Sequence, residues 1–221
     1  MSLSVGSRTM ARSIACAANK PLAQYRLRRL IAVDPGPYRL SLGSLNLAKQ
    51  GWIPTDISWR CPFFLDVTKP WPFSDGSVSH SYGDNMVEHL TLAGARQFFS
   101  HALRALMPDG VLRLATPNIG ALTDMYVSRD PRAQAILQRS AEIGLVAEHP
   151  VDLLRVAFAE HGHHLGYLWD ESTISTELRA AGFTRVDFWP VGESDDADLR
   201  GLESRTDEAS RISQLVVEAR P

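Results

Sequence analysis

The chain has 221 residues, of which 44% are hydrophobic and 22% are charged, as in an ordinary globular protein. Its 23 basic and 25 acidic residues give a net charge of −2, which argues against a nucleic-acid partner held by many phosphate contacts. No segment approaches the roughly 18 apolar residues of a membrane span. Cys16 and Cys61 are too few for a disulfide framework or a structural zinc site, so we expect a cytoplasmic location.

Residues 1–33 form a basic arm. They contain six basic residues and no acidic one, so the rest of the chain carries a net charge of −2 − 6 = −8. Residues 21–32 have the amphipathic pattern of a short helix. The residues before Pro21 are more typical of an unstructured terminus than of a signal or transit peptide. We therefore expect the arm to be distinct from a single domain over 34–221.

After residue 37, short apolar runs alternate with helical patterns. Strands are predicted over 38–42, 52–56, 62–67, 78–82, 111–116, 183–191 and 214–219, and helices over 91–106 and 171–181, with a largely helical insert at about 117–170. This alternation predicts an α/β fold with a doubly wound, Rossmann-like, mostly parallel sheet of seven strands. No helix is predicted between the last two strands, so they are expected to pair antiparallel.

The connection between the first two predicted strands is unusually short. Only eight residues, 44–51, join them, whereas a parallel crossover normally needs a dozen or more. A first crossover of this length has room for one turn of helix at most.

Acidic residues follow successive predicted strands. Asp56 ends the second strand, Asp66 ends the third and Asp84 follows the fourth, while Gly43 follows the first. Ligands of open parallel sheets bind at the carboxyl ends of the strands, near the switch in strand order. A carboxylate after the second strand can accept both hydroxyls of a ribose, so the pattern favours an adenosine-type ligand. A single aspartate here would instead be a turn or cap residue.

The same segments resemble a known family in their order and spacing. The resemblance is carried by 38–44, 51–57, Asp66 before 70–78, 88–90, 106–113, 164–170, 181–183, 192–194 and 216–219. Together they resemble class I S-adenosylmethionine-dependent methyltransferases, in particular the small bacterial predicted methyltransferases similar to methyltransferase type 11, over roughly residues 38–220. The resemblance implies a seven-stranded sheet whose last-added strand is antiparallel. It also implies S-adenosylmethionine as cofactor and a small molecule or sugar as methyl acceptor, with transfer to oxygen favoured over nitrogen.

The resemblance also implies which residues hold the cofactor. They are Gly43 and Ser44 at the methionine part, Asp56 and Ile57 at the ribose and adenine, Asp66 and Val67 at the adenine edge, and Asp84, Asn85 and Met86 as a wall after the fourth strand. One position departs from the family, which usually has Gly-x-Gly after the first strand, because Leu45 replaces the second glycine. If that residue has positive φ, leucine costs on the order of 1–2 kcal/mol.

Histidines form the remaining candidates. His161, His163 and His164 are close in sequence, but no carboxylate or cysteine stands at a recognisable metal-ligand spacing, so no metal site is predicted. In the resembling family this segment lies beside the substrate, and a hydroxyl acceptor benefits from a base with a near-neutral pKa. These histidines and His89 are therefore substrate-side candidates. No residue is assigned a catalytic role, and Glu88 with His89 could simply begin a helix.

Two other functions remain open. A catalytically silent relative, acting as a scaffold or partner protein, is suggested by Leu45. A nicotinamide-dependent oxidoreductase would also place an acidic residue after the second strand. It is disfavoured because the chain lacks Gly-x-Gly-x-x-Gly and a full helix after the first strand, whose N-terminus a pyrophosphate requires. S-adenosylmethionine has no phosphate and tolerates that loss better.

Overall fold

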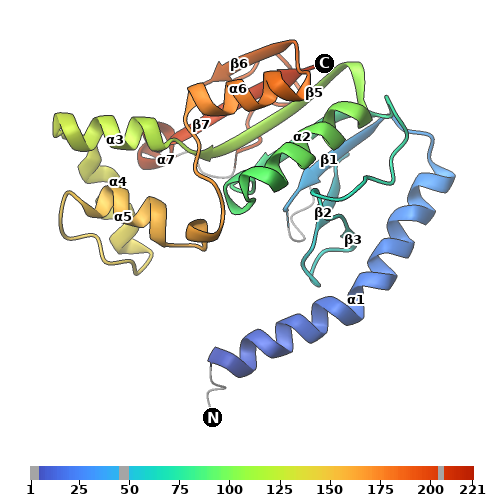
Figure 1. Ribbon diagram of the computed structural model, residues 1–221, viewed down its shortest axis with the longest axis horizontal. Coiled ribbons are helices and arrows are strands. Elements are labelled where there is room, and N and C mark those ends of the chain that lie inside the picture. The colour runs from blue at the N-terminus through green and yellow to red at the C-terminus, as the bar shows by residue number, and fades with distance from the viewer. Residues whose placement is uncertain (1–4, 45–49, 204–206) are drawn as a thin grey trace.

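The computed structural model describes residues 5–44, 50–203 and 207–221, and for 5–18 the backbone alone (Figure 1). Its centre is a seven-stranded sheet with the order β3-β2-β1-β4-β5-β7-β6. The strands are β1 (Tyr38–Leu42), β2 (Ile53–Asp56), β3 (Phe63–Phe64), β4 (Val78–Asp84), β5 (Leu106–Pro117), β6 (Arg185–Trp189) and β7 (Gln214–Arg220). β7 is antiparallel to β5 and β6, and the other neighbouring strands are parallel.

This strand order confirms the predicted fold class. Strands in the order 3-2-1-4-5-6 make up the doubly wound sheets that bind nucleotides. Here β7 is inserted antiparallel between β5 and β6. The expected mostly parallel sheet with its last strand antiparallel is therefore present, and the order of the strands reverses between β1 and β4.

The start of β5 differs from the prediction. The strand was expected from Val111, but it begins at Leu106 and includes Pro108, Asp109 and Gly110, residue types that favour turns. Leu106 pairs with Val78, and an irregularity in register then brings Val111 opposite His80. The residues that look like a turn in the sequence are thus extra residues within the paired strand.

One face of the sheet is covered by two helices. α2 (Leu92–Ala105) and α6 (Glu171–Ala181) lie together in front of the strands in Figure 1. Phe99 of α2 and Leu178 of α6 are buried with Leu114 of β5 in the main hydrophobic core. Both helices have the side-chain N-caps that the sequence favours, Thr91 for α2 and Asp170 for α6.

The other face of the sheet is covered by the segment 190–203 and contains a buried ion cluster. Side chains alternate along a strand, so Val111 and Arg113 of β5 both point to this face. The Arg113 Nε atom lies 2.7 Å from Glu203 Oε1, and its Nη1 atom lies 2.6 Å from Glu218 Oε1. All three side chains are almost fully buried. The cluster joins the segment to β5 and β7.

Helix α1 (Val5–Val33) is longer than predicted. A helix was expected only over 21–32, with an unstructured segment before it, and this expectation was wrong. Pro21 lies inside the helix, where a proline removes one backbone hydrogen bond and bends the axis without requiring the helix to end. Figure 1 shows the helix bending along its length. Ala23 and Leu27 are buried, so this part of α1 packs on the body of the protein.

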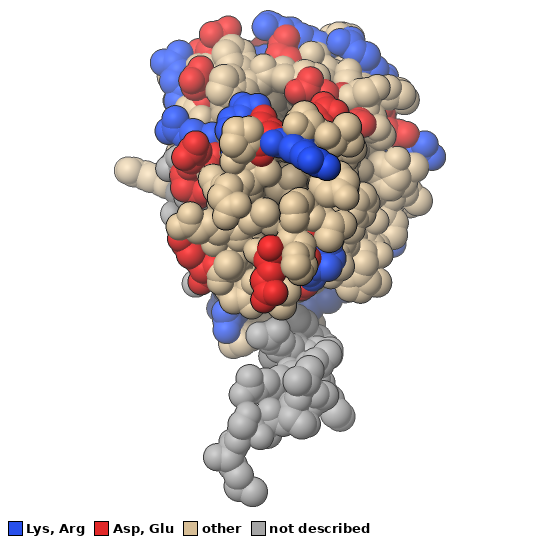
Figure 2. Space-filling model, turned by 90° about the vertical axis from the view of Figure 1, so that its left-hand side faces the viewer, with Lys and Arg blue, Asp and Glu red and all other residues tan. Residues whose placement is uncertain are grey.

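Three helices and a 3-10 turn follow β5, in the region of the expected helical insert. They are α3 (Ile119–Ser128), α4 (Ala133–Glu142), α5 (Asp152–Ala159) and η2 (His163–Leu165). Leu122, Leu137 and Leu153 form a separate small core between the three helices. Figure 2 views this end of the molecule, where uncharged residues occupy the middle of the face.

Two short elements complete the fold. η1 (Val87–His89) follows β4, and α7 (Glu208–Ser213) precedes β7. Among the helices in the described ranges, none is long and apolar enough to cross a membrane.

Candidate functional site

The carboxyl ends of β1, β2 and β4 lie side by side because these strands are parallel neighbours. Gly43 directly follows β1 and has φ +63°, in the left-handed region that favours glycine. A Cβ atom on Gly43 would lie 2.6 Å from Cγ of Met86, and one on Gly83 would lie 3.2 Å from its Cε. The Met86 side chain therefore lies across the ends of β1 and β4, where the strand order reverses.

The two aspartates next along this edge shape turns. Oδ1 of Asp56 accepts a hydrogen bond from the Ser58 backbone N–H at 2.7 Å. Oδ1 of Asp66 accepts from the Thr68 backbone N–H at 3.0 Å and from its hydroxyl at 2.7 Å. The turn role that the sequence left open is thus present at both positions. It fixes the Asp56 carboxylate at the end of β2 and the Asp66 carboxylate two residues after β3, which is shorter than the predicted strand over 62–67.

The neighbours of these aspartates differ in exposure. Ile57 is 59% exposed, whereas Val67 is buried in the main core, so at this part of the edge Ile57 offers the larger side-chain surface to a ligand. The Ser44 backbone N–H donates to the carbonyl oxygen of Thr55 at 3.3 Å, which holds the residue after β1 against β2. Leu45 lies outside the described residues, so the expected effect of this leucine stays a prediction.

The residues after β4 are tied to the strands beside them. Asp84 is the last residue of β4, and Asn85 follows it with φ +50°. The Asn85 backbone N–H donates to the carbonyl oxygen of Ala115 at 2.8 Å, and its side-chain Oδ1 accepts from Gln214 Nε2 at 3.1 Å. Asn85 is thereby fixed to both β5 and β7 in a conformation that few non-glycine residues adopt.

A cavity of about 620 Å³ opens beside Asn85, between the sheet edge and the insert. Its wall includes the predicted substrate-side residues His89, His161 and His163. His164 is exposed and does not line it. The structure therefore brings together three of the four predicted histidines, and Asn85 belongs to both the strand-end edge and the cavity.

Beside the cavity, His163 and Glu88 form a buried pair. Nδ1 of His163 lies 2.9 Å from the carbonyl oxygen of Ala157, so Nδ1 carries the hydrogen and donates it. Nε2 of the same ring lies 4.0 Å from Glu88 Oε1. The other oxygen of Glu88, Oε2, accepts from the Thr116 hydroxyl at 3.0 Å. The ring centroid of His89 is 5.1 Å from that of His163.

The pKa of His89 is lowered from its usual value. Partial burial is the main cause, and repulsion from His163 and His161 adds to it. The lowered pKa favours the uncharged imidazole, the form that can accept a proton or bind a metal ion.

Gly166 allows η2 to approach η1. A Cβ atom at this position would lie 1.9 Å from the carbonyl oxygen of Glu88. Any side chain here would force the insert away from the residue after β4. The close contact between His163 and Glu88 thus depends on a glycine that follows the histidine cluster in sequence.

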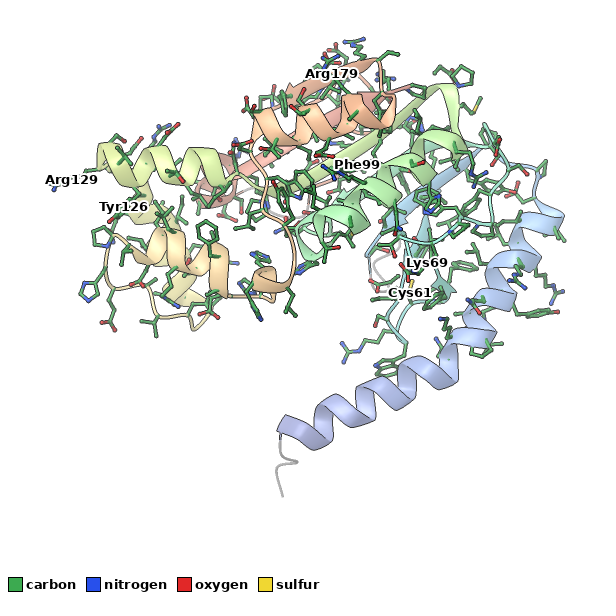
Figure 3. The ribbon with its side chains drawn as sticks, viewed as in Figure 1. Cys61, Lys69, Phe99, Tyr126, Arg129 and Arg179 are labelled. Atoms are coloured by element: carbon green, nitrogen blue, oxygen red, sulfur yellow. The ribbon has the colours of Figure 1, made fainter. Side chains whose placement is uncertain are left out.

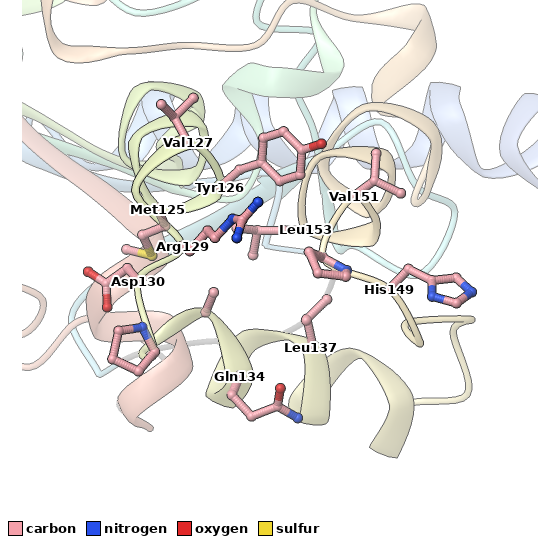
Figure 4. Close-up of a pocket in the computed structure, with 13 residues that line it drawn as sticks. Met125, Tyr126, Val127, Arg129, Asp130, Gln134, Leu137, His149, Val151 and Leu153 are labelled. Atoms are coloured by element: carbon pink, nitrogen blue, oxygen red, sulfur yellow. The ribbon is translucent and has the colours of Figure 1, made fainter.

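A second cavity, of about 720 Å³, lies within the insert between α3, α4 and α5. Figure 3 shows Tyr126 and Arg129 projecting from the insert, well away from Cys61 near β3. In Figure 4, both residues line this second cavity together with Gln134 and His149. None of the predicted site residues that the structure describes belongs to its wall.

Sequence reasoning missed two members of the site. Glu88 was interpreted as part of a helix start, and Gln214 was placed only in a strand. Each lies far in sequence from its partner, His163 for Glu88 and Asn85 for Gln214. Local sequence patterns do not predict contacts between residues so far apart in the chain.

Comparison with known proteins gives matches to solved structures. No family model and no curated protein matches the chain. A SAM-dependent methyltransferase from Thermotoga maritima is 11% identical, with 90% of each chain covered and a TM-score of 0.49. One from Archaeoglobus fulgidus is 16% identical, with 91% of this chain and 94% of that chain covered and a TM-score of 0.49. The methyltransferase (CMeT) domain of the citrinin polyketide synthase is 16% identical, with a TM-score of 0.49.

The chain spans about half the length of several structures that it matches. It covers 50% of the citrinin synthase chain and 53% of the CurJ carbon methyltransferase. The assignment of the fold rests on the sheet itself. Seven strands in a doubly wound order, with β7 antiparallel between β5 and β6, agree with the sheet that the sequence resemblance implies.

Proposed function

We propose that the chain binds S-adenosylmethionine at the carboxyl edge of the sheet and transfers its methyl group to an oxygen of a small molecule or sugar. The observation that carries the proposal is the convergence of Gly43, Asp56 and Asn85 at the ends of β1, β2 and β4. In doubly wound sheets, nucleotide-like ligands bind at this edge, next to the reversal in strand order.

Each residue at the edge has a chemical role in this proposal. Asp56 accepts hydrogen bonds from the ribose hydroxyls, and the exposed side chain of Ile57 packs beside the adenine. Asp66 and Val67 lie at the adenine edge. Gly43 and Ser44 contact the methionine part through their backbone.

The wall after β4 borders both proposed ligands. Asp84, Asn85 and Met86 form this wall, and Asn85 also lines the 620 Å³ cavity. An acceptor held in the cavity would therefore approach the cofactor past Asn85. His89 lines the same cavity as a neutral imidazole, so it can take the proton that a hydroxyl acceptor loses on methylation.

The residues present fit this cofactor better than a dinucleotide. S-adenosylmethionine carries no phosphate, so it needs no helix N-terminus after β1, and only the ten residues 43–52 separate β1 from β2. When bound, the cofactor supplies a methyl group on a positively charged sulfur. The chain has to orient the acceptor oxygen in line with that group, and positioning accounts for most of the catalysis.

Titration calorimetry with S-adenosylmethionine and S-adenosylhomocysteine tests the cofactor. We expect both to bind, and Asp56→Ala to weaken binding at least tenfold, because a hydrogen bond to a charged group contributes about 1.5–3 kcal/mol. Asp109→Asn is the matched control, since Asp109 is exposed at the opposite end of β5. Absence of binding by either compound at millimolar concentration would rule out the proposal.

The acceptor is tested by turnover. Release of S-adenosylhomocysteine is measured with sugars and small alcohols, and with the corresponding amines in parallel. We expect turnover with hydroxyl acceptors, reduced in His89→Gln. Faster turnover with the amines would contradict transfer to oxygen while leaving methyl transfer intact.

A catalytically silent relative is the second candidate. The observation that favours it is the Met86 side chain, which lies over Gly43 in the space between the ends of β1 and β4. If Met86 excludes the cofactor, Met86→Ala will create binding that the parent chain lacks. If the parent chain binds the cofactor and Met86→Ala does not improve its affinity, this candidate is excluded.

A further inference from the structure

Glu88, His89 and His163 form a compact group of metal-ligating side chains. One ligand atom from each residue lies within 4.8 Å of those from the other two. Glu88 and His89 come from η1 after β4, and His163 comes from η2 of the insert. The group therefore bridges the sheet and the insert at the edge of the 620 Å³ cavity.

The hydrogen bonds around the group orient it as in known metal sites. Ligating histidines usually donate their second ring N–H to a carbonyl or carboxylate, which fixes the tautomer. Nδ1 of His163 donates in this way to Ala157, so its unprotonated Nε2 is the atom that faces Glu88. The Thr116 hydroxyl holds Oε2 of Glu88, and Oε1 is the oxygen directed towards His163.

The group also has access from solvent. His89 and His163 both line the cavity, and His89 is exposed. His161 lines the cavity too, with its ring centroid 5.8 Å from that of His163. His161 has φ +56°, a conformation that is uncommon outside glycine. An ion can therefore reach the group without opening the core.

A second group of such side chains in the described chain is already paired with arginines. His80, Asp196 and Asp198 are equally close together. However, Asp198 is paired with Arg39 at 2.7 Å, and Asp196 lies 4.0 Å from Arg220. These arginines already supply the positive charge that a metal ion would bring.

We propose that Glu88, His89 and His163 bind a divalent transition-metal ion of the zinc class. Two imidazoles and one carboxylate are a ligand set of zinc sites that keep an open fourth position. In a tetrahedral site, ligands about 2.1 Å from the ion lie roughly 3.4 Å from one another. Ligand atoms that lie up to 4.8 Å apart therefore need to approach one another by at most about 1.4 Å, and a fourth ligand would reach the ion from the cavity that His89 and His163 line. This inference does not depend on cofactor binding, but an ion bound to His89 would occupy the imidazole nitrogen that the proposed function assigns to the acceptor proton.

Metal titration of the full chain, purified without a histidine tag, tests the site. Zn²⁺ binding is followed by calorimetry, and Co²⁺ serves as a spectroscopic probe because its visible absorption reports tetrahedral coordination. We expect one ion per chain, a dissociation constant in the micromolar range or below, and an intense visible Co²⁺ band. His89→Gln should weaken binding at least tenfold and remove the band. His164→Gln, an exposed neighbour outside the group, should change neither.

Thermal unfolding provides a second measurement that does not require spectroscopy. An ion that binds only the folded chain raises the unfolding midpoint. Zn²⁺ should raise the midpoint of the parent chain and of His164→Gln, and should raise that of His89→Gln and Glu88→Gln much less. Equal binding and equal midpoint shifts in all four proteins, or no binding by the parent chain, would overturn the proposal. Cofactor titration of the same variants is a separate measurement, so failure of the metal site and failure of the methyltransferase proposal are distinguishable.

Discussion

The sheet edge and the insert place their functional residues by different means. At the edge, Gly43 and Asp56 are fixed by strand ends and tight turns, and Met86 packs closely over the glycine. In the insert, the helices enclose a cavity of about 720 Å³, and together with η1 and α7 they line another cavity of about 620 Å³. Figure 3 shows how far the insert extends from the strands. From this difference we expect the edge to be rigid and the insert to be adaptable.

Among the variants considered, we expect the largest loss of stability in the sheet, where its buried ion cluster is broken. Glu203→Ala leaves the Arg113 guanidinium buried with one of its two carboxylate partners missing. Breaking a buried pair in this way costs about 3–5 kcal/mol of the free energy of unfolding. Chemical denaturation monitored by tryptophan fluorescence measures this loss.

The matched control for Glu203→Ala is Glu177→Ala, which removes the partner of the mostly exposed Arg96. Because Arg96 is mostly exposed, we expect this pair to contribute only about 0–1 kcal/mol. If the two variants lose equal stability, the second face of the sheet does not depend on its ion cluster.

A smaller and more local loss is expected in the insert. Leu153 is 3% exposed, belongs to the small core of the insert and also lines both cavities. Leu153→Ala should cost about 2–3 kcal/mol, at the low end for leucine truncation because the site already adjoins open space. Relative to the parent chain, amide hydrogen exchange in Leu153→Ala should be accelerated more in α3, α4 and α5 than in β4 and β5.

Val127→Ala is the control for this prediction, because Val127 is 75% exposed on the same insert. Equal acceleration of exchange in the sheet and the insert of Leu153→Ala would show that the two regions open as one unit. The contrast between a rigid edge and an adaptable insert would then be wrong.

The sequence predicted the edge better than the insert because the edge is built from local patterns. An apolar run followed by an aspartate predicts both a strand and the place of its carboxylate, as at Asp56. The pairing of Glu88 with His163 has no such local signal, because it depends on how the insert folds back and on the close approach at Gly166. The early start of β5 at Leu106 likewise depends on pairing with Val78.

At the edge itself, Gly43→Ala tests how tightly Met86 is packed. Positive φ costs a non-glycine residue about 1–2 kcal/mol, and the new Cβ atom would lie 2.6 Å from Met86 Cγ. We expect a loss of about 2 kcal/mol in the free energy of unfolding, together with weaker cofactor binding. In the double variant Gly43→Ala/Met86→Ala, the clash between the new Cβ atom and the Met86 side chain is removed. The losses in the free energy of unfolding of the two single variants should therefore not add up in the double variant. Strict additivity would mean that the backbone conformation alone excludes alanine.

The smallest expected effect is the acid sensitivity of the insert. Asp152 accepts hydrogen bonds from the Arg155 guanidinium and from the backbone N–H groups of His149 and Glu148, which lower the pKa of its carboxyl from 3.8 to about 2. Because the folded state depresses this pKa, the carboxylate stabilises the insert above about pH 4, and the stabilisation is lost as the pH falls towards 2. Circular dichroism of Asp152→Asn should show a weaker dependence on pH in that window than the parent chain, because the neutral amide has no charge to lose. If Asp152→Asn and the parent chain unfold identically with falling pH, the Asp152 carboxylate does not stabilise the insert. The helices around the two cavities would then be held together by their apolar core.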